Sequence, residues 1–285
     1  MALQKSTLLD YYRKGIEQHI LEAKKKTKNN EKSTLINSQM KKLLSEKLNS
    51  IATKDFESIL MVHYTYYIAM LEARNQVWEY DYMSFSRRIG ELWEPFCKLP
   101  FEYSINKVDS YEPPKYDKVK RNLHKNISEY IDSLKICHVE KSRLLDFIDE
   151  VWAFSESGAI NLTEDLHFSI GSDRYVVDYK SGFSSNEKGN VNRLLQVAKI
   201  YSTLGYKCLL FVRQPEEENN HYLQTLKNSN LWEVYCSSDT YDKIFEITGI
   251  DLRKWMDRNM DWTNDISSDF RDYLVKNNLI QYLTW

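Results

Sequence analysis

The spacing of apolar residues predicts a helical first part of the chain. Over roughly the first hundred residues, apolar positions recur every three or four residues among Lys and Glu, as on one face of an amphipathic helix. The expected helices are Leu8–Lys26, Leu35–Ile51, Phe56–Tyr82 and Phe85–Phe96. We expect Pro95 or Pro100 to end the last of them. The third is so densely apolar that its aromatic side chains, Tyr64, Tyr66 and Tyr67, are expected in a core rather than stacked on nucleic-acid bases.

The period changes in the second half of the chain. Apolar and polar residues alternate over residues 161–182, which predicts two short strands, whereas Asp117–Leu134 and Lys141–Trp152 before them are helical in pattern. Helix, strand, helix and strand then follow in turn, at Val191–Leu204, Tyr206–Arg213, His221–Ser229 and Leu231–Ser237. Three short helices close the chain, around Tyr241–Ile247, Leu252–Met260 and Ser268–Leu279. The expected fold class is α/β (α+β), with a largely helical N-terminal half followed by a mixed β-sheet core flanked by helices.

A proline pair suggests where the two parts meet. Pro113-Pro114 lies in the segment Tyr103–Lys115, where regular structure is disfavoured. We therefore expect a helical region over residues 1–102, a linker over 103–116, and a second region over 117–285 that includes the C-terminal helices.

The alternating segment carries the candidate chemistry. Gly171-Ser172 is typical of a two-residue type II′ hairpin turn, and that turn pairs Ile170 with Asp173. Asp165 and Asp178 then lie directly opposite each other on one face of the hairpin, where two like charges destabilise the pair. A hard divalent cation such as Mg²⁺ compensates such a pair, and Lys180 points to the same side as Asp178. An ammonium group there can position or stabilise a metal-activated hydroxide that attacks a phosphodiester.

Other interpretations of this hairpin remain open. Asp and Lys are also normal residues on the solvated face of an ordinary hairpin, and a three-residue turn would shift the register and place the two aspartates on different faces. The metal-site interpretation is preferred, because Lys180-Ser-Gly, a polar loop, a helix and a further strand follow the hairpin. His167 lies on the same face, but no second histidine follows at metal-ligand spacing, so we expect it to be a bystander.

Asp165, a gap of twelve residues and then Asp178-Tyr179-Lys180 resemble the signature of the PD-(D/E)xK nuclease superfamily. The core of that superfamily is a helix, a three-strand meander, a helix and a further strand, and the order expected from Leu162 to Ser237 is similar. Glu164, not Pro, precedes Asp165 here. The resemblance implies that Asp165 and Asp178 ligate Mg²⁺, that the main-chain carbonyl of Tyr179 adds a ligand, and that Lys180 serves the attacking water.

The resemblance also implies accessory residues. Superfamily members often carry a further acid on a helix beside the sheet, and Glu94 in SRRIGELWEPF is the preferred candidate, with Glu91 and Glu150 as competitors. Gln196 corresponds to a glutamine that assists the site or contacts the DNA backbone. Three residues near the start of the same helix are implied phosphate contacts: Lys188, Asn190 and Arg193.

Charge and composition add modest constraints. Residues 1–50 hold eleven Lys and Arg against five Asp and Glu, whereas residues 214–285 hold seven against thirteen. A basic N-terminal segment can follow a polyanion such as DNA, or it can be a solvated helix face. The four cysteines form no CxxC pair and are expected to be reduced, mostly buried thiols of an intracellular protein. We find no apolar run long enough to span a membrane and expect no signal peptide.

Taken together, the residues and the resemblance imply a type II restriction endonuclease, or one subunit of a heterodimeric enzyme that cuts an asymmetric site. The expected cofactor is Mg²⁺. The expected partners are double-stranded DNA and a second subunit, identical or related, and the expected location is a prokaryotic-type cytoplasm. Two alternatives stand beside this hypothesis: a structure-selective repair or mobile-element nuclease, and a non-enzymatic helical interaction or DNA-binding protein.

Overall fold

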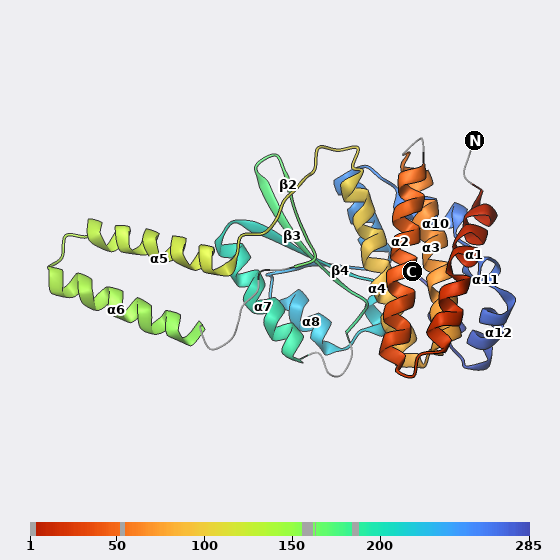
Figure 1. The fold of residues 1–285 in the computed structure, drawn as a ribbon. Coiled ribbons are helices and arrows are strands. Elements are labelled where there is room, and N and C mark those ends of the chain that lie inside the picture. The colour runs from red at the N-terminus through yellow and green to blue at the C-terminus, as the bar shows by residue number, and fades with distance from the viewer. Residues whose placement is uncertain (1–3, 52–54, 156–161, 163, 184–187) are drawn as a thin grey trace.

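The chain folds around a five-stranded mixed sheet with helices on both faces (Figure 1). The computed structural model describes residues 4–51, 55–155, 162, 164–183 and 188–285, and no side chains over residues 151–155. The strands are β1 (Asp109–Ser110), β2 (Leu166–Ile170), β3 (Asp173–Lys180), β4 (Tyr206–Val212) and β5 (Glu233–Cys236). This arrangement agrees with the expected fold class, a mixed sheet core preceded by a largely helical half.

Four long helices form the N-terminal part: α1 (Lys5–Lys24), α2 (Asn29–Ser50), α3 (Phe56–Val77) and α4 (Tyr82–Glu102). Side-chain caps fix where two of them begin. The Asp55 carboxylate accepts from the Ser58 N–H at the start of α3, and Asp81 forms a capping box with Ser84 at the start of α4. Helix α3 is buried on most sides, and its three tyrosines are at most 5% exposed. The prediction that they belong to the core is confirmed.

The expected end of α4 at a proline is wrong. The helix continues through both Pro95 and Pro100 and ends at Glu102. Beyond Pro95, several side chains of the helix are buried: Phe96, Cys97, Leu99, Pro100 and Phe101. Burial of these apolar groups offsets the hydrogen bond that each proline removes.

The hairpin forms in the predicted register. Ile170 pairs with Asp173, Phe168 with Tyr175 and Leu166 with Val177, and Gly171 has φ of 59°. A three-residue turn is therefore excluded. Strand β4 is parallel to β3, and α7 (Lys188–Thr203) connects the two. Strand β5 is parallel to β4, and the connection between them contains η1 (Glu216–Glu218) and α8 (His221–Asn228).

The two faces of the sheet bury different halves of the molecule. Because side chains alternate along a strand, Val176, Cys208 and Leu210 pack with α7 and α8, whereas Val177, Leu209 and Phe211 pack toward the helical part. Strands β3 and β4 therefore have apolar side chains on both faces, as a parallel pair covered on both sides requires.

Two further segments differ from the expected arrangement. The predicted linker contains β1, which pairs with β2 through Asp109↔Ser169. Two residues are too few to show any period, so the sequence pattern missed this strand. The helical pair α5 (Tyr116–Ser133) and α6 (His138–Ser155) projects away from the sheet (Figure 1).

The C-terminal helices return to the N-terminal ones. They are α9 (Ser238–Thr248), α10 (Leu252–Asn259), α11 (Trp262–Asp265) and α12 (Ser268–Lys276), followed by η2 (Ile280–Tyr282); α11 was not expected from the sequence. One hydrophobic cluster includes residues from both ends of the chain, such as Leu8 and Phe270. Among the described residues, no helix has both the length and the apolar character that crossing a membrane demands.

Candidate active site

The two predicted aspartates meet where β2 begins and β3 ends. Asp178 lies in β3 and is 2% exposed, and Asp165 immediately precedes β2. An oxygen of Asp165 accepts a hydrogen bond from the Tyr179 N–H at 2.7 Å, which ties it to the neighbouring strand. The hairpin register thus places both carboxylates at one end of the sheet.

Asp178 is held by two cationic side chains. Lys180 forms an ion pair with one carboxylate oxygen, and Arg193 of α7 approaches the other at 3.2 Å. The Lys180 ammonium also donates to the Tyr179 carbonyl at 3.2 Å. As expected, Lys180 and Asp178 are on the same side of β3.

Glu164 also lies at this end of the sheet, and the sequence interpretation missed its role. Its side chain is fully buried, and one oxygen accepts from Arg193 at 2.8 Å. The other oxygen is buried and makes no hydrogen bond of normal length and angle among the described residues, although the Tyr201 hydroxyl lies near enough to act on this carboxyl as a donor. Burial raises the pKa of Glu164, Asp178 raises it further, and Tyr201 and Arg193 oppose the rise. In the sequence, Glu164 was notable only because it stands where the nuclease motif has a proline. Nothing in its spacing linked it to Arg193.

Helix α4 reaches this end of the sheet through Gly90. A Cβ atom at this glycine would lie only 2.7 Å from the Ser181 Cβ, so the close approach depends on the missing side chain. One turn later, Glu94 pairs with Lys98 at 2.6 Å. Both of these side chains lie close enough to act electrostatically on Asp165.

The pKa of Asp165 is raised to about 6. Burial is the main cause, and the negative charges of Asp178 and Glu94 add to it. The Tyr179 N–H and the Lys98 ammonium act in the opposite direction but do not offset the rise. Asp165 is therefore partly desolvated, and the nearby hydrogen-bond donor and ammonium group do not fully compensate its negative charge.

The two competing acids lie elsewhere. Glu91 pairs with Arg87 at 2.7 Å and with Arg88 at 2.9 Å along the surface of α4. Glu150 is exposed on α6, in the projecting pair of helices. Of the three candidates for the accessory acid, Glu94 is the one whose charge acts on Asp165.

The predicted DNA-contacting residues of α7 are only partly near the carboxylates. Arg193 uses two nitrogens on Glu164 and Asp178, and its side chain is 42% exposed. Gln196 and Lys188 are exposed, and Asn190 is half-buried. Residues 184–187 of the preceding loop lie outside the described residues.

Arg213 closes the other side of this end of the sheet. It directly follows β4, is 8% exposed, and donates to the Ser181 hydroxyl and to the Thr284 carbonyl, each at 3.0 Å. Its backbone N–H donates to the Lys180 carbonyl at 2.9 Å. Arg213 therefore fixes the backbone that carries Lys180, a role that no motif in the sequence indicated.

His167 belongs to the structural part of the sheet. It is 3% exposed, and its Nε2 lies 2.7 Å from the Tyr201 hydroxyl. Burial lowers the pKa of His167 to about 4, so the ring is neutral near pH 7. This agrees with the expectation that it is a bystander.

The donor set suits a hard divalent cation, although the present spacing does not yet form a ligand cage. Asp165, Asp178 and Glu94 offer carboxylate oxygens, which Mg²⁺ prefers, and the oxygen of Glu164 that lacks a normal hydrogen bond adds to the excess of acceptors. Within the described part of the chain, no three His, Cys, Asp or Glu side chains are placed so that they could hold a metal ion. Metal binding would require the Lys180 and Arg193 side chains to release oxygens of Asp178.

Comparison with protein-family models, with curated proteins and with solved structures found no match to this chain. Its function is therefore argued from the chemistry of the carboxylate site itself.

Proposed function

We propose that this protein is a Mg²⁺-dependent endodeoxyribonuclease of the PD-(D/E)xK type, acting as a type II restriction endonuclease or as one subunit of such an enzyme. The observation that carries the proposal is the placement of Asp165 and Asp178 at one end of the sheet, with Lys180 paired to Asp178 and the Tyr179 N–H bonded to Asp165. Burial raises the pKa of Asp165, and the charges of Asp178 and Glu94 raise it further. Carboxylates with a shifted pKa next to a cationic side chain are more frequent at functional sites than in ordinary hairpins.

The order of elements around the site supports the same proposal. Helix α4, the antiparallel strands β1, β2 and β3, helix α7 and the parallel strand β4 follow one another along the chain, with α5 and α6 between β1 and β2. This order resembles the succession of helix, three-strand meander, helix and strand that the sequence motif implies. The short strand β1 supplies the member of the meander that the sequence pattern lacked.

Each residue then has a definite task. Asp165 and Asp178, with Glu94, would hold Mg²⁺, and the bound metal would offset negative charge on the phosphate oxygens. Lys180 would orient the attacking water and stabilise the hydroxide by its charge. Arg213 keeps the Lys180 backbone in place, and Glu164 holds Arg193 beside Asp178.

A plasmid-nicking assay with Mg²⁺ tests the proposal. We expect Lys180→Ala to reduce the cleavage rate by at least about 1,000-fold, because transition-state electrostatics of this kind are typically worth several kcal/mol. The matched control is Lys207→Ala: Lys207 pairs with Asp173 at 2.7 Å at the other end of the sheet. Equal cleavage by the Lys180 variant and the wild type would overturn the assigned role of Lys180. If the wild type showed no Mg²⁺-dependent cleavage, the nuclease proposal would be overturned.

The products separate the remaining alternatives. A site-specific enzyme gives discrete fragments from a long double-stranded DNA, whereas a structure-selective repair nuclease gives smears or cuts only branched substrates. One subunit of a heterodimeric enzyme would nick a single strand. Binding without cleavage would favour the non-enzymatic alternative.

A further inference from the structure

The helices α5 and α6 form a two-helix arm that extends away from the rest of the molecule (Figure 1). They run antiparallel, each has 18 residues, and a connection at residues 134–137 joins them at the tip. His124 of α5 lies 3.1 Å from Asp149 of α6, so the two helices are in contact. The arm begins directly after the Pro113-Pro114 segment, beside the edge of the sheet.

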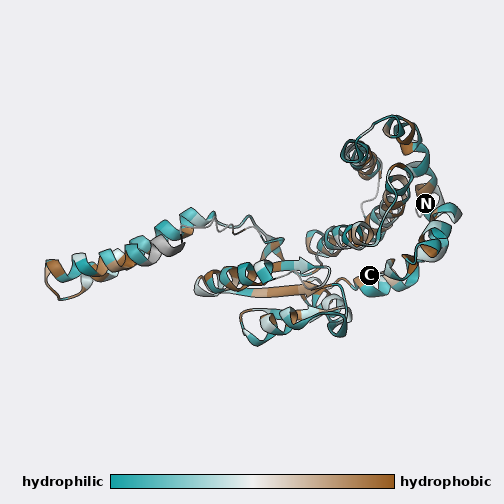
Figure 2. Cartoon of the chain, turned by 90° about the horizontal axis from the view of Figure 1, so that it is seen from below, coloured by the Kyte–Doolittle hydropathy of each residue, from teal (hydrophilic) through white to brown (hydrophobic). Residues whose placement is uncertain are grey.

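Many apolar side chains of the arm are exposed, because α5 and α6 cannot bury them against each other alone. Only Val119 and Ile131 are buried in α5, and no described side chain of α6, residues 138–150, is buried. Figure 2 shows hydrophobic residues distributed along the whole arm. Its exposed large apolar side chains, with their exposed fractions, are Tyr130 (67%), Ile136 (37%), Val139 (76%), Leu144 (37%) and Phe147 (49%). Exposed apolar residues gathered on one projecting element are typical of a protein contact.

The charges of the arm favour a protein partner over DNA. Residues 116–155 contain seven Lys and Arg and seven Asp and Glu, so the arm has no net positive charge to attract a polyanion. Charge is instead divided along α6. Residues 138–145 carry Lys141 and Arg143 against Glu140, or +1 by subtraction, whereas residues 146–155 carry three acids and no Lys or Arg, or −3: Asp146, Asp149 and Glu150. A helix with this distribution is complementary to an antiparallel copy of itself.

We propose that the arm is a dimerisation element, in which the arms of two copies of this chain pack antiparallel as a four-helix bundle. A two-fold axis crossing near the middle of α6 brings Arg143 of each copy beside Glu150 of the other, and it covers Leu144 and Phe147. An 18-residue helix is about 27 Å long and about 10 Å wide, so two arms bury roughly 1,000 Å² or more, which is the lower range for a stable interface.

The oligomeric state of the full chain tests this inference. Sedimentation or light scattering is expected to give twice the chain mass of 34.0 kDa. The double variant Leu144→Glu, Phe147→Glu is expected to weaken the dimer by at least about 100-fold, because it places charge in the centre of the contact in both copies. The control is Phe245→Glu on α9, which is 49% exposed and lies outside the arm. A monomeric wild type at tens of micromolar, or equal weakening by the control, overturns the proposal.

Two experiments test the antiparallel arrangement without placing charge in the apolar contact. Arg143→Glu alone is expected to weaken the dimer, and the pair Arg143→Glu, Glu150→Arg is expected to restore it. Cys137 is the exposed cysteine and lies at the tip of the arm, whereas the other three are buried. In antiparallel arms the two Cys137 thiols lie at opposite ends of the bundle, so mild oxidation is expected to give no covalent dimer. A disulfide-linked dimer through Cys137 would exclude this geometry.

This inference stands independently of the nuclease proposal. Loss of dimerisation in the arm variants leaves the residues of the carboxylate site unchanged, so Mg²⁺ binding by each chain is expected to persist. A protein that does not nick DNA would therefore leave the arm proposal intact. A protein that is monomeric would leave the assignment of Asp165 and Asp178 intact.

Discussion

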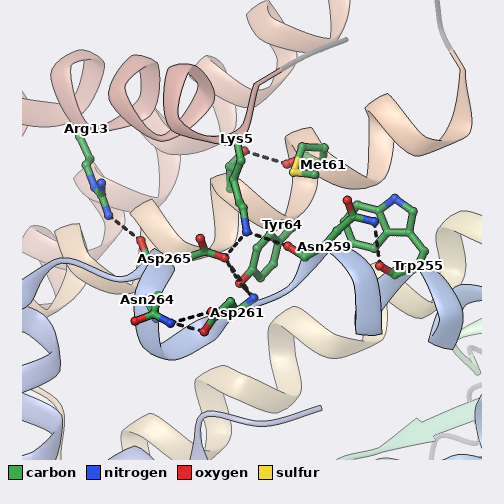
Figure 3. A network of polar contacts seen from close by, with 10 residues as sticks. Lys5, Arg13, Met61, Tyr64, Trp255, Asn259, Asp261, Asn264 and Asp265 are labelled. Carbon is green, nitrogen blue, oxygen red and sulfur yellow. Dashed lines mark hydrogen bonds and ion pairs between the residues drawn. The ribbon is translucent and has the colours of Figure 1, made fainter.

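Two partly buried ionic networks in this protein differ in how completely their acids are paired. In the helical part, Asp265 of α11 accepts from Lys5 at 2.7 Å, from the Tyr64 hydroxyl at 2.8 Å and from the Asp261 N–H at 3.1 Å (Figure 3). Beside it, Glu72 accepts two bonds from Arg13, at 2.8 and 2.7 Å, and a third from the Ser267 N–H at 2.6 Å. Both acids join α1 or α3 to the C-terminal helices, and each has several donors.

The carboxylate site has the opposite character. One oxygen of Glu164 is buried and makes no hydrogen bond of normal geometry in the described structure, and Asp165 has a raised pKa, mainly from burial and further from Asp178 and Glu94. A fold gains no stability from such an arrangement, because desolvated acids without full compensation are costly. The comparison indicates that the helical network stabilises the fold, whereas the carboxylate site retains an unmet demand for positive charge that a cation can fill.

The largest effect on stability is expected in the helical network. Glu72→Ala leaves the partly buried Arg13 without its acid and the Ser267 N–H without its acceptor, so the free energy of unfolding should fall by about 3–5 kcal/mol. Urea denaturation measures it. Glu17→Ala on the exposed surface of α1 is the control and should change stability by at most about 0.5 kcal/mol. Equal small effects of both variants would remove the contrast between the networks.

In the carboxylate site, removing an acid is expected to stabilise the protein. The folded-state pKa of Asp165, about 6, lies above its ordinary value of 3.8, so its ionisation costs stability as pH rises through that interval. Asp165→Asn should therefore raise the free energy of unfolding at pH 8 by on the order of 2 kcal/mol, and by roughly half as much at pH 5. A destabilised variant at pH 8 would contradict the interpretation of this site as short of positive charge.

The accessory acid gives a smaller effect, on activity. Glu94→Gln removes a carboxylate whose charge acts on Asp165, and we expect cleavage to slow by about 10- to 100-fold, as for other residues that support a metal site. The control is Glu91→Gln on the same helix. It should leave the cleavage rate unchanged, since Glu91 pairs with Arg87 and Arg88 on the surface of α4. If the Glu91 variant were the slower of the two, the assignment of the accessory acid would be reversed.

Metal binding itself is expected to give the smallest shift. With a Kd near 1 mM, 10 mM Mg²⁺ stabilises the folded state by about 1.4 kcal/mol, or roughly 2–3 °C in Tm for a chain of this length. Thermal unfolding at pH 8 measures this shift in the wild type, and it should be reduced in Asp165→Asn. Asp265→Asn, in the helical network, should retain the full Mg²⁺-dependent shift from its own lower starting Tm.

Local patterns in the chain were sufficient to predict the hairpin and its register. Gly171 takes the positive φ that the turn requires, and from there the period of two brings Asp165 and Asp178 to the same end of the sheet. The turn and the register depend on residues that are close in sequence, so the residue types and their alternation are enough to predict them.

Long-range contacts decided the rest. Glu164 and Arg193 are 29 residues apart, and Arg13 and Glu72 are 59 apart, so their pairing follows from how helices and strands pack and has no local signature. For the same reason, α4 continues through two prolines that would end an isolated helix, and the short β1 exists only because β2 offers it a partner. Amino-acid order specified the elements and the acids at their ends, whereas packing determined which charges were neutralised and which were left short of a counter-ion.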